Sequence, residues 1–561
     1  MDPLLSRYSV IVVDEAHERS LSSDVLLGVL KKIRVRRPDL RIVVSSATLD
    51  AEAFLDFFAG KADPASLGSR NETSARDTIG RIVSIEGRAF PVDIHYLTTP
   101  CENYLTTAIN TIFEIHASEP EGDILVFLTG RSEIESALQR IADRLHTTTS
   151  STTLLPLPLY AGLPSDQQTQ VFEPANPGTR KVILATNIAE ASVTIENITH
   201  VIDPGYVKLR AFSPLTGIAS LTTTPISRAS ATQRAGRAGR TKAGKCYRLY
   251  TASAFESLPP TTVPEIQRSD LAPLVLQLKA LGIDNIARFD FFTPPPAELV
   301  VRALETLFAL GALDEYAKLT KPLGLRMAEL GLEPMMAKSL LEAGKFECAG
   351  EMLSIAAMVS LQGNLWFTSD SKEEDRARRV FAVEEGDHLT LLNIYTAFVG
   401  KGKKEAKWCQ KHQLNYKSVM KAVSVRNQLR RALERFGIDV DEKNDKDTTA
   451  GGKFADLSKA DRIRRCLVAG FFANAARMLP DGTFRLASDA ADEAAGGGGG
   501  DGREKGRVFN AHPSSLMFNR KAEWVVFGEV VEMKGKGYLR DITKIERGWL
   551  IEAAPGFWRM R

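Results

Sequence analysis

Short apolar runs alternate with amphipathic stretches through the N-terminal part of this sequence, and this alternation limits the possible folds more than any other feature. The runs are rich in β-branched residues and predict buried strands; they span residues 9–13, 41–45, 123–128, 181–185 and 200–203. Apolar residues at helical spacing lie between them, as in residues 24–33 and 131–145. Strand and helix in alternation predict an α/β fold with a parallel sheet.

Polar residues follow three of these predicted strands at the point where each strand ends. Asp14 and Glu15 follow the first strand, residues 46–48 the second, and Thr186 and Asn187 the fourth. Open parallel sheets bind their ligands beyond the carboxyl ends of the strands. The three clusters therefore lie where such a sheet is expected to hold a ligand.

The rest of the chain changes character twice. From about residue 268 the pattern is that of helices joined by short turns, and after residue 477 strand-like segments return. A Gly-rich polar insertion at 487–506 interrupts these strands and has too few apolar residues to pack. A chain of 561 residues is expected to divide into about three to five domains.

Composition excludes several classes of protein. No apolar run reaches the roughly 18 residues that span a bilayer, and the N-terminal residues do not form a secretory signal, so we expect a cytosolic or nuclear protein. The five cysteines form no CxxC pair and have no histidines at ligand spacing, so disulfides and structural zinc are not expected. With 72 basic and 69 acidic residues the net charge is only +3, which by itself predicts no nucleic-acid partner, and any nucleic-acid-binding surface must be local.

The tetrapeptide Asp14-Glu15-Ala16-His17 follows an apolar strand. P-loop NTPases place a carboxylate at this point to hold magnesium through water, with a neighbour that orients the attacking water. Two adjacent acids at a strand end suit that chemistry. The alternatives are chance surface acidity or a helix N-cap, a position that acidic residues favour.

A second cluster, residues 233–240, reads QRAGRAGR and spaces three arginines three residues apart. A helix would present Arg234, Arg237 and Arg240 on nearly one face, with glycines that allow close approach. Guanidinium groups match phosphate oxygens bidentately, and an arginine finger contributes about 10³ to 10⁵ in rate to phosphoryl transfer. The alternative is a solvated basic helix, which would not need glycines that weaken helices by about 1 kcal/mol each.

Taken together, these clusters make the sequence resemble the DEAH/RHA helicases of superfamily 2, in its spliceosomal branch. The family's motifs occur in order as DEAH at 14–17, SAT at 46–48, ILVFLTGRSEIE at 124–135, ATNIAEASVTI at 185–195 and QRAGRAGR at 233–240. The resemblance covers the whole chain. It implies tandem RecA-like domains, the first one incomplete, followed by a winged helix, a helical ratchet bundle and an OB-fold β-barrel. The implied boundaries are 1–90, 91–264, 265–335, 336–460 and 461–561.

The resemblance also implies roles for individual residues around ATP and Mg²⁺. Asp14 and Glu15 match the magnesium-binding and water-activating carboxylates, and His17 matches a residue that links the two motor domains. Ser46 and Thr48 match positions that couple hydrolysis to RNA. Gln233 matches the residue that positions the attacking water, and Arg237 and Arg240 match the phosphate contacts, with Arg240 the better candidate for the finger.

Further positions match the family's adenine, ribose and RNA contacts. Phe172 matches the aromatic residue that stacks on adenine, although a plain core phenylalanine is the alternative. Thr194 and Glu196 match positions near the ribose and nucleotide. The family more often has aspartate at the position of Glu196. Residues that match the RNA-backbone contacts are Thr129, Gly130, Thr186 and Asn187. Ala191 stands where the family usually has threonine, which puts one polar contact in doubt.

The sequence contains no Gly-x-x-x-x-Gly-Lys-Ser/Thr motif to wrap and neutralise ATP phosphates. Because Asp14 is only the fourteenth residue, we expect the chain to begin inside its first domain and to be poorly active as written. The implied function is a 3′ to 5′ ATP-dependent RNA helicase of nuclear pre-mRNA splicing, with RNA, a spliceosomal ribonucleoprotein and a G-patch activator protein as partners. The alternative is a catalytically inactive RNA-binding scaffold.

Overall fold

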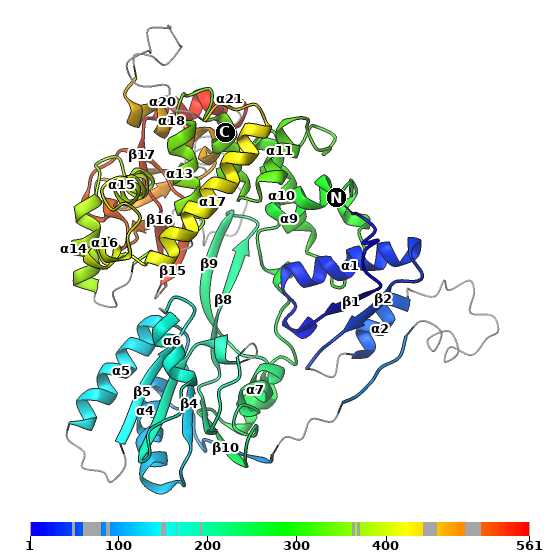
Figure 1. Cartoon of the computed structure of the whole chain (residues 1–561), viewed down its shortest axis with the longest axis vertical. Helices are drawn as coiled ribbons and strands as arrows, with labels where there is room; N and C mark the ends of the chain where they lie inside the picture. Colours follow the sequence, from blue (N-terminus) through cyan, green and yellow to red (C-terminus); the bar gives the residue numbers. More distant parts are fainter. Residues whose placement is uncertain are drawn as a thin grey trace, which may run out of the picture. The chain divides into compact units, whose positions relative to one another are not determined.

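The computed structural model divides the chain into two compact units, each described here by itself (Figure 1). Unit 1 comprises Met1–Leu209, Thr222–Arg268 and Asp290–Pro295, and unit 2 comprises Arg210–Leu221, Ser269–Phe289 and Pro296–Arg561. The structure describes residues 2–47, 51–59, 80–85, 90–146, 153–163, 165–190, 193–361, 365–366, 371–440, 457–487, 507–533 and 535–559. The predicted insertion at 487–506 lies, apart from Ala487, outside the described residues.

Unit 1 begins with a two-stranded parallel sheet of β1 (Val10–Val13) and β2 (Arg41–Val44). The strands are joined through the 3-10 turn η1 (Ala16–Glu18) and α1 (Leu21–Arg36), and α2 (Ala51–Ala59) follows β2. Their core contains Leu27, Leu30 and Phe54, and Phe54 stacks on Phe292 with ring centroids 4.6 Å apart.

The second sheet of unit 1 has six parallel strands in the order β3-β10-β7-β4-β6-β5. They are β3 (Val92–Tyr96), β10 (Gly244–Arg248), β7 (Ile198–Asp203), β4 (Asp123–Phe127), β6 (Thr179–Ala185) and β5 (Thr153–Leu159). The strands expected near 123–128, 181–185 and 200–203 are all present. Central strands β4 and β7 are buried throughout, as a parallel sheet covered on both faces requires.

Helices cover both faces of this sheet. Alternate residues of β4 point to opposite faces: Ile124 and Val126 join a core with α4 (Tyr104–Ser118) and α5 (Arg131–Leu145). Leu125 and Phe127 join a second core with residues of α6 (Ser165–Phe172) and α7 (Arg228–Ala235). The remaining elements are η3 (Asn187–Ala189), α8 (Ala252–Ser257) and η4 (Glu265–Gln267).

A β-hairpin of β8 (Tyr206–Ser213) and β9 (Ile218–Pro225) contributes its tip to unit 2. The rest of the helical region comprises η5 (Ile286–Arg288), α9 (Ala272–Ala280), α10 (Ala297–Ala309), α11 (Leu323–Leu330), α12 (Pro334–Glu342), α13 (Ala349–Val359), α14 (Ser371–Phe381), α15 (Asp387–Val399), α16 (Ala406–Lys411), α17 (Tyr416–Arg435) and α18 (Lys459–Phe471). None of the helices in the described part of the chain is both long and apolar enough to cross a membrane.

A seven-stranded sheet closes unit 2, in the order β15-β16-β13-β12-β11-β14-β17. Its elements are β11 (Ala475–Met478), β12 (Phe484–Leu486), β13 (Phe509–Ala511), η6 (Leu516–Asn519), β14 (Trp524–Val526), β15 (Glu529–Met533), β16 (Lys536–Arg540), β17 (Thr543–Ile545), α20 (Arg547–Ala553) and α21 (Pro555–Arg559). Ile218 of the hairpin packs into the core of this sheet, and Arg210 pairs with Glu529 at 3.0 Å. The architecture is the predicted α/β region followed by a helical region and a β domain.

Candidate functional site

The turn after β1 presents two carboxylates to solvent. Asp14 and Glu15 are both exposed, and Asp14 Oδ1 accepts a hydrogen bond from the Glu15 N–H at 2.9 Å. Glu15 has a left-handed backbone with φ of 50°, a conformation that non-glycine residues seldom adopt and that clusters at functional sites. The turn therefore places adjacent acids at a strand end, as the sequence predicted.

His17 joins this turn to the end of β2. Its side chain is only 5% exposed, and Nε2 lies 3.2 Å from Glu15 Oε2. The Ala47 N–H donates to His17 Nδ1 at 3.1 Å, so in a neutral ring the proton lies on Nε2 and faces Glu15. His17 thus holds the Glu15 carboxylate against the SAT segment. Ser46 is half-buried in that segment, and Thr48 lies outside the described residues.

Arg19 anchors the same turn and was not predicted as a functional residue. It forms a bidentate pair with the fully buried Asp24, with both N···O distances 2.8 Å. Its guanidinium also lies 4.3 Å from the Phe292 ring centroid. The only sequence signal for this pair was an acid at position 24, at the start of an amphipathic helix. If such an acid is buried it needs a paired cation, because acids are almost never fully buried unless paired.

The predicted helical face of three arginines is wrong. Helix α7 ends at Ala235, and the Arg237 and Ala238 N–H groups bond three residues back, to Arg234 and Ala235 carbonyls, in consecutive turns. The arginines therefore separate into two environments. A β-carbon at Gly239 would lie 2.6 Å from the Phe90 carbonyl oxygen, so this close approach to the segment before β3 requires glycine.

Arg234 is buried and serves the fold. Its Nε lies 2.9 Å from Glu190 and its Nη1 2.8 Å from Asp203, and the guanidinium stacks over Phe127 at 4.7 Å. Glu190 also accepts a hydrogen bond from Ser230. Because both carboxylates are engaged by this one guanidinium, Arg234 joins the segment after β6, the end of β7 and α7.

Arg237 and Arg240 remain closer to solvent and are engaged by the segment after residue 192. Arg237 donates to the Val193 carbonyl at 3.0 Å, and Arg240 donates to the Thr194 hydroxyl. Burial, then the charge of Arg240, lowers the pKa of Arg237 to about 10, and burial also lowers the pKa of Arg240. The negative charge of Glu15 opposes both shifts, so it acts on both guanidiniums.

The other predicted nucleotide contacts are accessible. Phe172 is 46% exposed at the end of α6, whereas Val171 beside it is fully buried. The phenylalanine is therefore not a core residue, and it has a face free to stack. Thr194 and Glu196 are exposed and Gln233 is half-buried. Ala191 lies outside the described residues.

The predicted RNA contacts gather at the ends of two neighbouring strands. Phe127 of β4 pairs with Ala185 of β6, so Thr129 and Gly130 follow one strand where Thr186 and Asn187 follow the other. The Leu128 N–H donates to the Ala185 carbonyl at 2.8 Å and extends this register.

Gly130 begins α5, and a β-carbon there would lie 3.1 Å from Lys208 Nζ. Thr129 Oγ1 is buried near the Tyr104 hydroxyl. A helix N-terminus and a lysine ammonium favour an anion. Lys208 lies in the hairpin segment and was missed because nothing in its local sequence marks it as a neighbour of Gly130.

Comparison with known proteins decides the family. Four domain profiles match, in chain order: "Helicase conserved C-terminal domain" at 107–242, the winged-helix and ratchet-like parts of "Helicase associated domain (HA2)" at 303–332 and 333–391, and "Oligonucleotide/oligosaccharide-binding (OB)-fold" at 463–557. The human protein named probable ATP-dependent RNA helicase DHX35 is 48% identical over 100% of this chain and 74% of its own length. The chain belongs to the DEAH-box RNA helicases.

Two further relatives extend this result. The Caenorhabditis elegans homolog of DHX35 is 45% identical over 99% of this chain and 71% of its own length. The Schizosaccharomyces pombe pre-mRNA-splicing factor ATP-dependent RNA helicase prp22 is 42% identical over 100% of this chain and 44% of its own length. Segments such as GFFANAAR and KWCQKHQLNYKS predict a likeness to the helicase numbered thirty-five in the human DEAH series, and this likeness is confirmed.

The family uses ATP, and the carboxylate of Asp14 in this DEAH-box helicase fits the way proteins bind the Mg²⁺ of a nucleotide. Mg²⁺ usually keeps several waters and binds one or two carboxylates together with substrate phosphates. Asp14 is exposed with one oxygen engaged by a backbone N–H, which leaves the other free for such a role. Nowhere in the described ranges do three or more His, Cys, Asp or Glu side chains form a metal cage.

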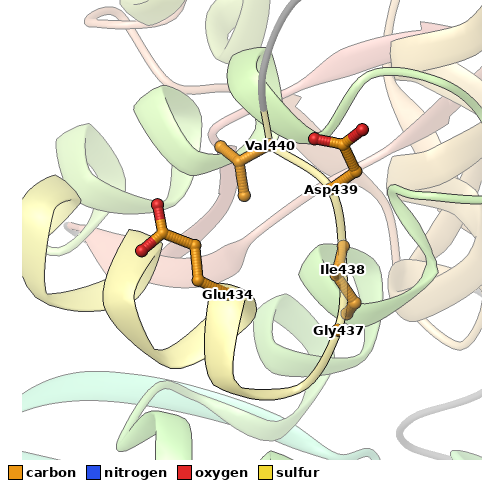
Figure 2. A pocket seen from close by; sticks show the side chains of 5 residues that line it. All are labelled: Glu434, Gly437, Ile438, Asp439 and Val440. Atoms are coloured by element: carbon orange, nitrogen blue, oxygen red, sulfur yellow. The ribbon is translucent and has the colours of Figure 1, made fainter.

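A pocket of about 280 Å³ lies in unit 2 of the helicase, at the end of α17. Figure 2 shows Glu434 on the last turn of the helix and Asp439 and Val440 on the segment that follows. None of its five lining residues belongs to a helicase motif. Two carboxylates at its rim disfavour a polyphosphate, so we do not assign the nucleotide there.

Proposed function

We propose that this protein is an RNA-stimulated ATPase that moves 3′ to 5′ along RNA during pre-mRNA splicing in the nucleus. The observation that supports this most is the electrostatic coupling of Glu15 to Arg237 and Arg240. A carboxylate that activates water and guanidiniums that stabilise phosphate charge must act on the same phosphoryl group.

For hydrolysis, Asp14 holds the Mg²⁺ of the nucleotide and Glu15 orients the attacking water with Gln233. Arg237 and Arg240 contact the phosphates, with Arg240 as the finger because it is the more exposed of the two. His17 keeps Glu15 in place through the 3.2 Å contact. The exposed face of Phe172 stacks on adenine, and Thr194 and Glu196 lie near the ribose.

For movement, the ends of β4 and β6 hold RNA phosphates through Thr129, Gly130, Thr186 and Asn187. Lys208 adds a positive charge beside Gly130. Backbone contacts of this kind carry no sequence information and suit a motor that moves along any RNA. Ser46 and Thr48 couple the nucleotide to this path, because the Ala47 between them is hydrogen bonded to His17.

The expected partners are RNA and a spliceosomal ribonucleoprotein, because the yeast relative prp22 is named a splicing factor. A G-patch protein is the proposed activator. A pull-down from nuclear extract with the purified protein, followed by mass spectrometry, tests this assignment, and recovery without any G-patch protein or splicing factor contradicts it.

The test of the motor is RNA-stimulated ATP hydrolysis by the 561-residue chain and by a longer chain that adds a P-loop-containing segment at its N-terminus. Because the 561 residues contain no P-loop motif, we propose that they alone hydrolyse ATP poorly and that the longer protein is active. In the longer protein, Glu15→Gln should lower kcat by about 10² to 10⁴, the usual contribution of a positioned base.

Glu18→Gln is the matched control, since Glu18 is exposed on the same turn, and it should leave kcat unchanged. Robust turnover by the 561-residue chain would refute the role of the P-loop. If both proteins are folded and bind RNA but neither hydrolyses ATP, the proposed motor function is wrong and the RNA-binding scaffold is the better description.

A further inference from the structure

The chain concentrates positive charge in one segment of unit 2 that the helicase motifs do not include. Residues 401–421 hold seven lysines and one acid, Glu405. The lysines are Lys401, Lys403, Lys404, Lys407, Lys411, Lys417 and Lys421, and all seven are exposed. No ion pair joins any of them to another residue that the structure describes. We call these seven side chains the lysine surface.

The lysine surface is mounted on a rigid support. The buried Gly402 donates its N–H to the Ala397 carbonyl at 2.8 Å, and a β-carbon there would lie 2.7 Å from the Trp408 ring. Trp408 packs against His412 at 4.1 Å and against Phe398 at 6.0 Å. The turn, α16 and the start of α17 are thus fixed to the core of the ratchet.

The arrangement costs the free protein stability. Lys403 and Lys404 have φ values of 45° and 60°, in the left-handed region that is unfavourable for residues with a side chain. Lys407 and Lys411, and likewise Lys417 and Lys421, stand four residues apart in a helix, where like charges repel. A bound polyanion would relieve the repulsion, and strained residues of this kind cluster at ligand contacts.

We propose that the lysine surface binds the phosphates of single-stranded RNA, as a site separate from the RNA contacts at the ends of β4 and β6. The proposal rests on the RNA-dependent function above. Lysine acts as a point charge on a flexible stem, which suits a sequence-independent phosphate contact. Protein–protein interfaces are depleted in lysine, so an acidic protein is the weaker choice. Tyr416 is 37% exposed beside Lys417 and offers a ring for base stacking.

The test compares Lys407→Ala/Lys411→Ala with the control Lys318→Ala/Lys321→Ala, which removes two exposed lysines from another part of unit 2. Alanine favours helix at both α16 positions, so folding should be retained. Fluorescence anisotropy would measure binding of two labelled oligouridylates, one of about 8 and one of about 40 nucleotides, against salt.

For the longer RNA, we expect Lys407→Ala/Lys411→Ala to make the plot of log K against log salt less steep by about 1.4. Each lost phosphate contact removes about 0.7 from the magnitude of its negative slope. Binding of the short RNA, which fills only the motor site, should not change. The control should match the wild type with both RNAs.

Equal loss for both RNAs would place the lysines in the motor's own RNA path and overturn a separate surface. No loss for either RNA would also overturn it. If the protein binds polyglutamate more tightly than the longer RNA, and this binding depends on the two lysines, the ligand of the lysine surface is an acidic protein and not RNA. Lys208→Ala tests the proposed motor site independently. If this variant does not weaken binding of the short RNA, the RNA contact proposed beside Gly130 is wrong, and the proposal for the lysine surface is unaffected.

Discussion

At the scale of single residues, Arg234 and Arg237 look equivalent in the sequence but differ in what surrounds them. Arg234 is 1% exposed and bonds two carboxylates, so Arg234→Ala would leave both acids without their partner. Breaking such a buried group costs about 3 to 5 kcal/mol. We expect thermal melting of this variant to begin markedly earlier than in the wild type.

Arg237→Ala is the matched change, because Arg237 is less buried and donates to the Val193 carbonyl, a neutral acceptor. It should cost about 1 kcal/mol of stability but lower RNA-stimulated turnover of the P-loop-containing protein by about 10- to 100-fold, the usual loss of a hydrogen bond to a charged group. Equal melting temperatures for the two variants would contradict the division into a structural and a phosphate-binding arginine.

This division shows what the sequence alone could not settle at the residue scale. The repeated Arg-Ala-Gly pattern indicated phosphate-binding chemistry, which stays a prediction, and it predicted one helical face for all three arginines, which is wrong. The ion-pair partners of the buried Arg234 are Glu190, which follows β6, and Asp203, the last residue of β7, and only the fold brings them together. The Glu15–His17 turn could be expected from its place after β1, whereas for the Arg19–Asp24 pair the sequence offered only an acid at the start of a helix and did not name its partner.

At the scale of elements, Gly236 and Gly239 of the QRAGRAGR motif have different structural roles. A β-carbon at Gly239 would meet the Phe90 carbonyl oxygen at 2.6 Å and Val92 at 2.7 Å, whereas at Gly236 the nearest atom lies at 3.4 Å. We expect Gly239→Ala to destabilise the protein by about 1 to 3 kcal/mol, the usual cost of overpacking. Gly236→Ala should leave the melting temperature unchanged, and a comparable loss for both would refute this.

Strand β7 gives the sheet a predicted sensitivity to acid. Burial, then the charge of Arg180, lowers the pKa of His200 from 6.5 to about 4. The unfolded chain therefore binds the proton first, and stability present above pH 6.5 is lost as the pH falls toward about 4. The shift corresponds to about 3 kcal/mol.

Hydrogen exchange of the β4 and β7 amides between these pH values would measure the loss. His200→Gln should flatten the dependence, while His146→Gln, at the exposed end of α5, should not. A wild-type profile with no slope beyond that of the His200 variant would contradict the assignment.

The strands themselves were predictable only where their pattern was strong. Central strands such as β4 and β6 are continuous apolar runs, and the sequence identified them within a few residues. Strand β5 was missed because Pro156 and Pro158 argue against a strand; it lies at the sheet edge, where proline is tolerated. Strands β3 and β10 carry polar residues such as Asp93 and Lys245, and their pairing depends on partners far along the chain.

At the scale of the whole molecule, a net charge of +3 hides strong local differences in surface character. One is the lysine surface. Another is an apolar face on the first sheet, where Val10, Val12 and Val43 are 47%, 62% and 48% exposed. Val12 lies opposite Val43 in register, so the three side chains share one face of β1 and β2.

Exposed apolar faces on short sheets favour association with other chains. We expect the 561-residue protein to self-associate as its concentration rises, and Val10→Thr/Val12→Thr to shift sedimentation toward the monomer while keeping β-branched residues in the strand. Val35→Thr is the control, because Val35 is 81% exposed but stands on α1. If the strand variant and the control sediment alike, the apolar face formed by Val10, Val12 and Val43 does not drive association.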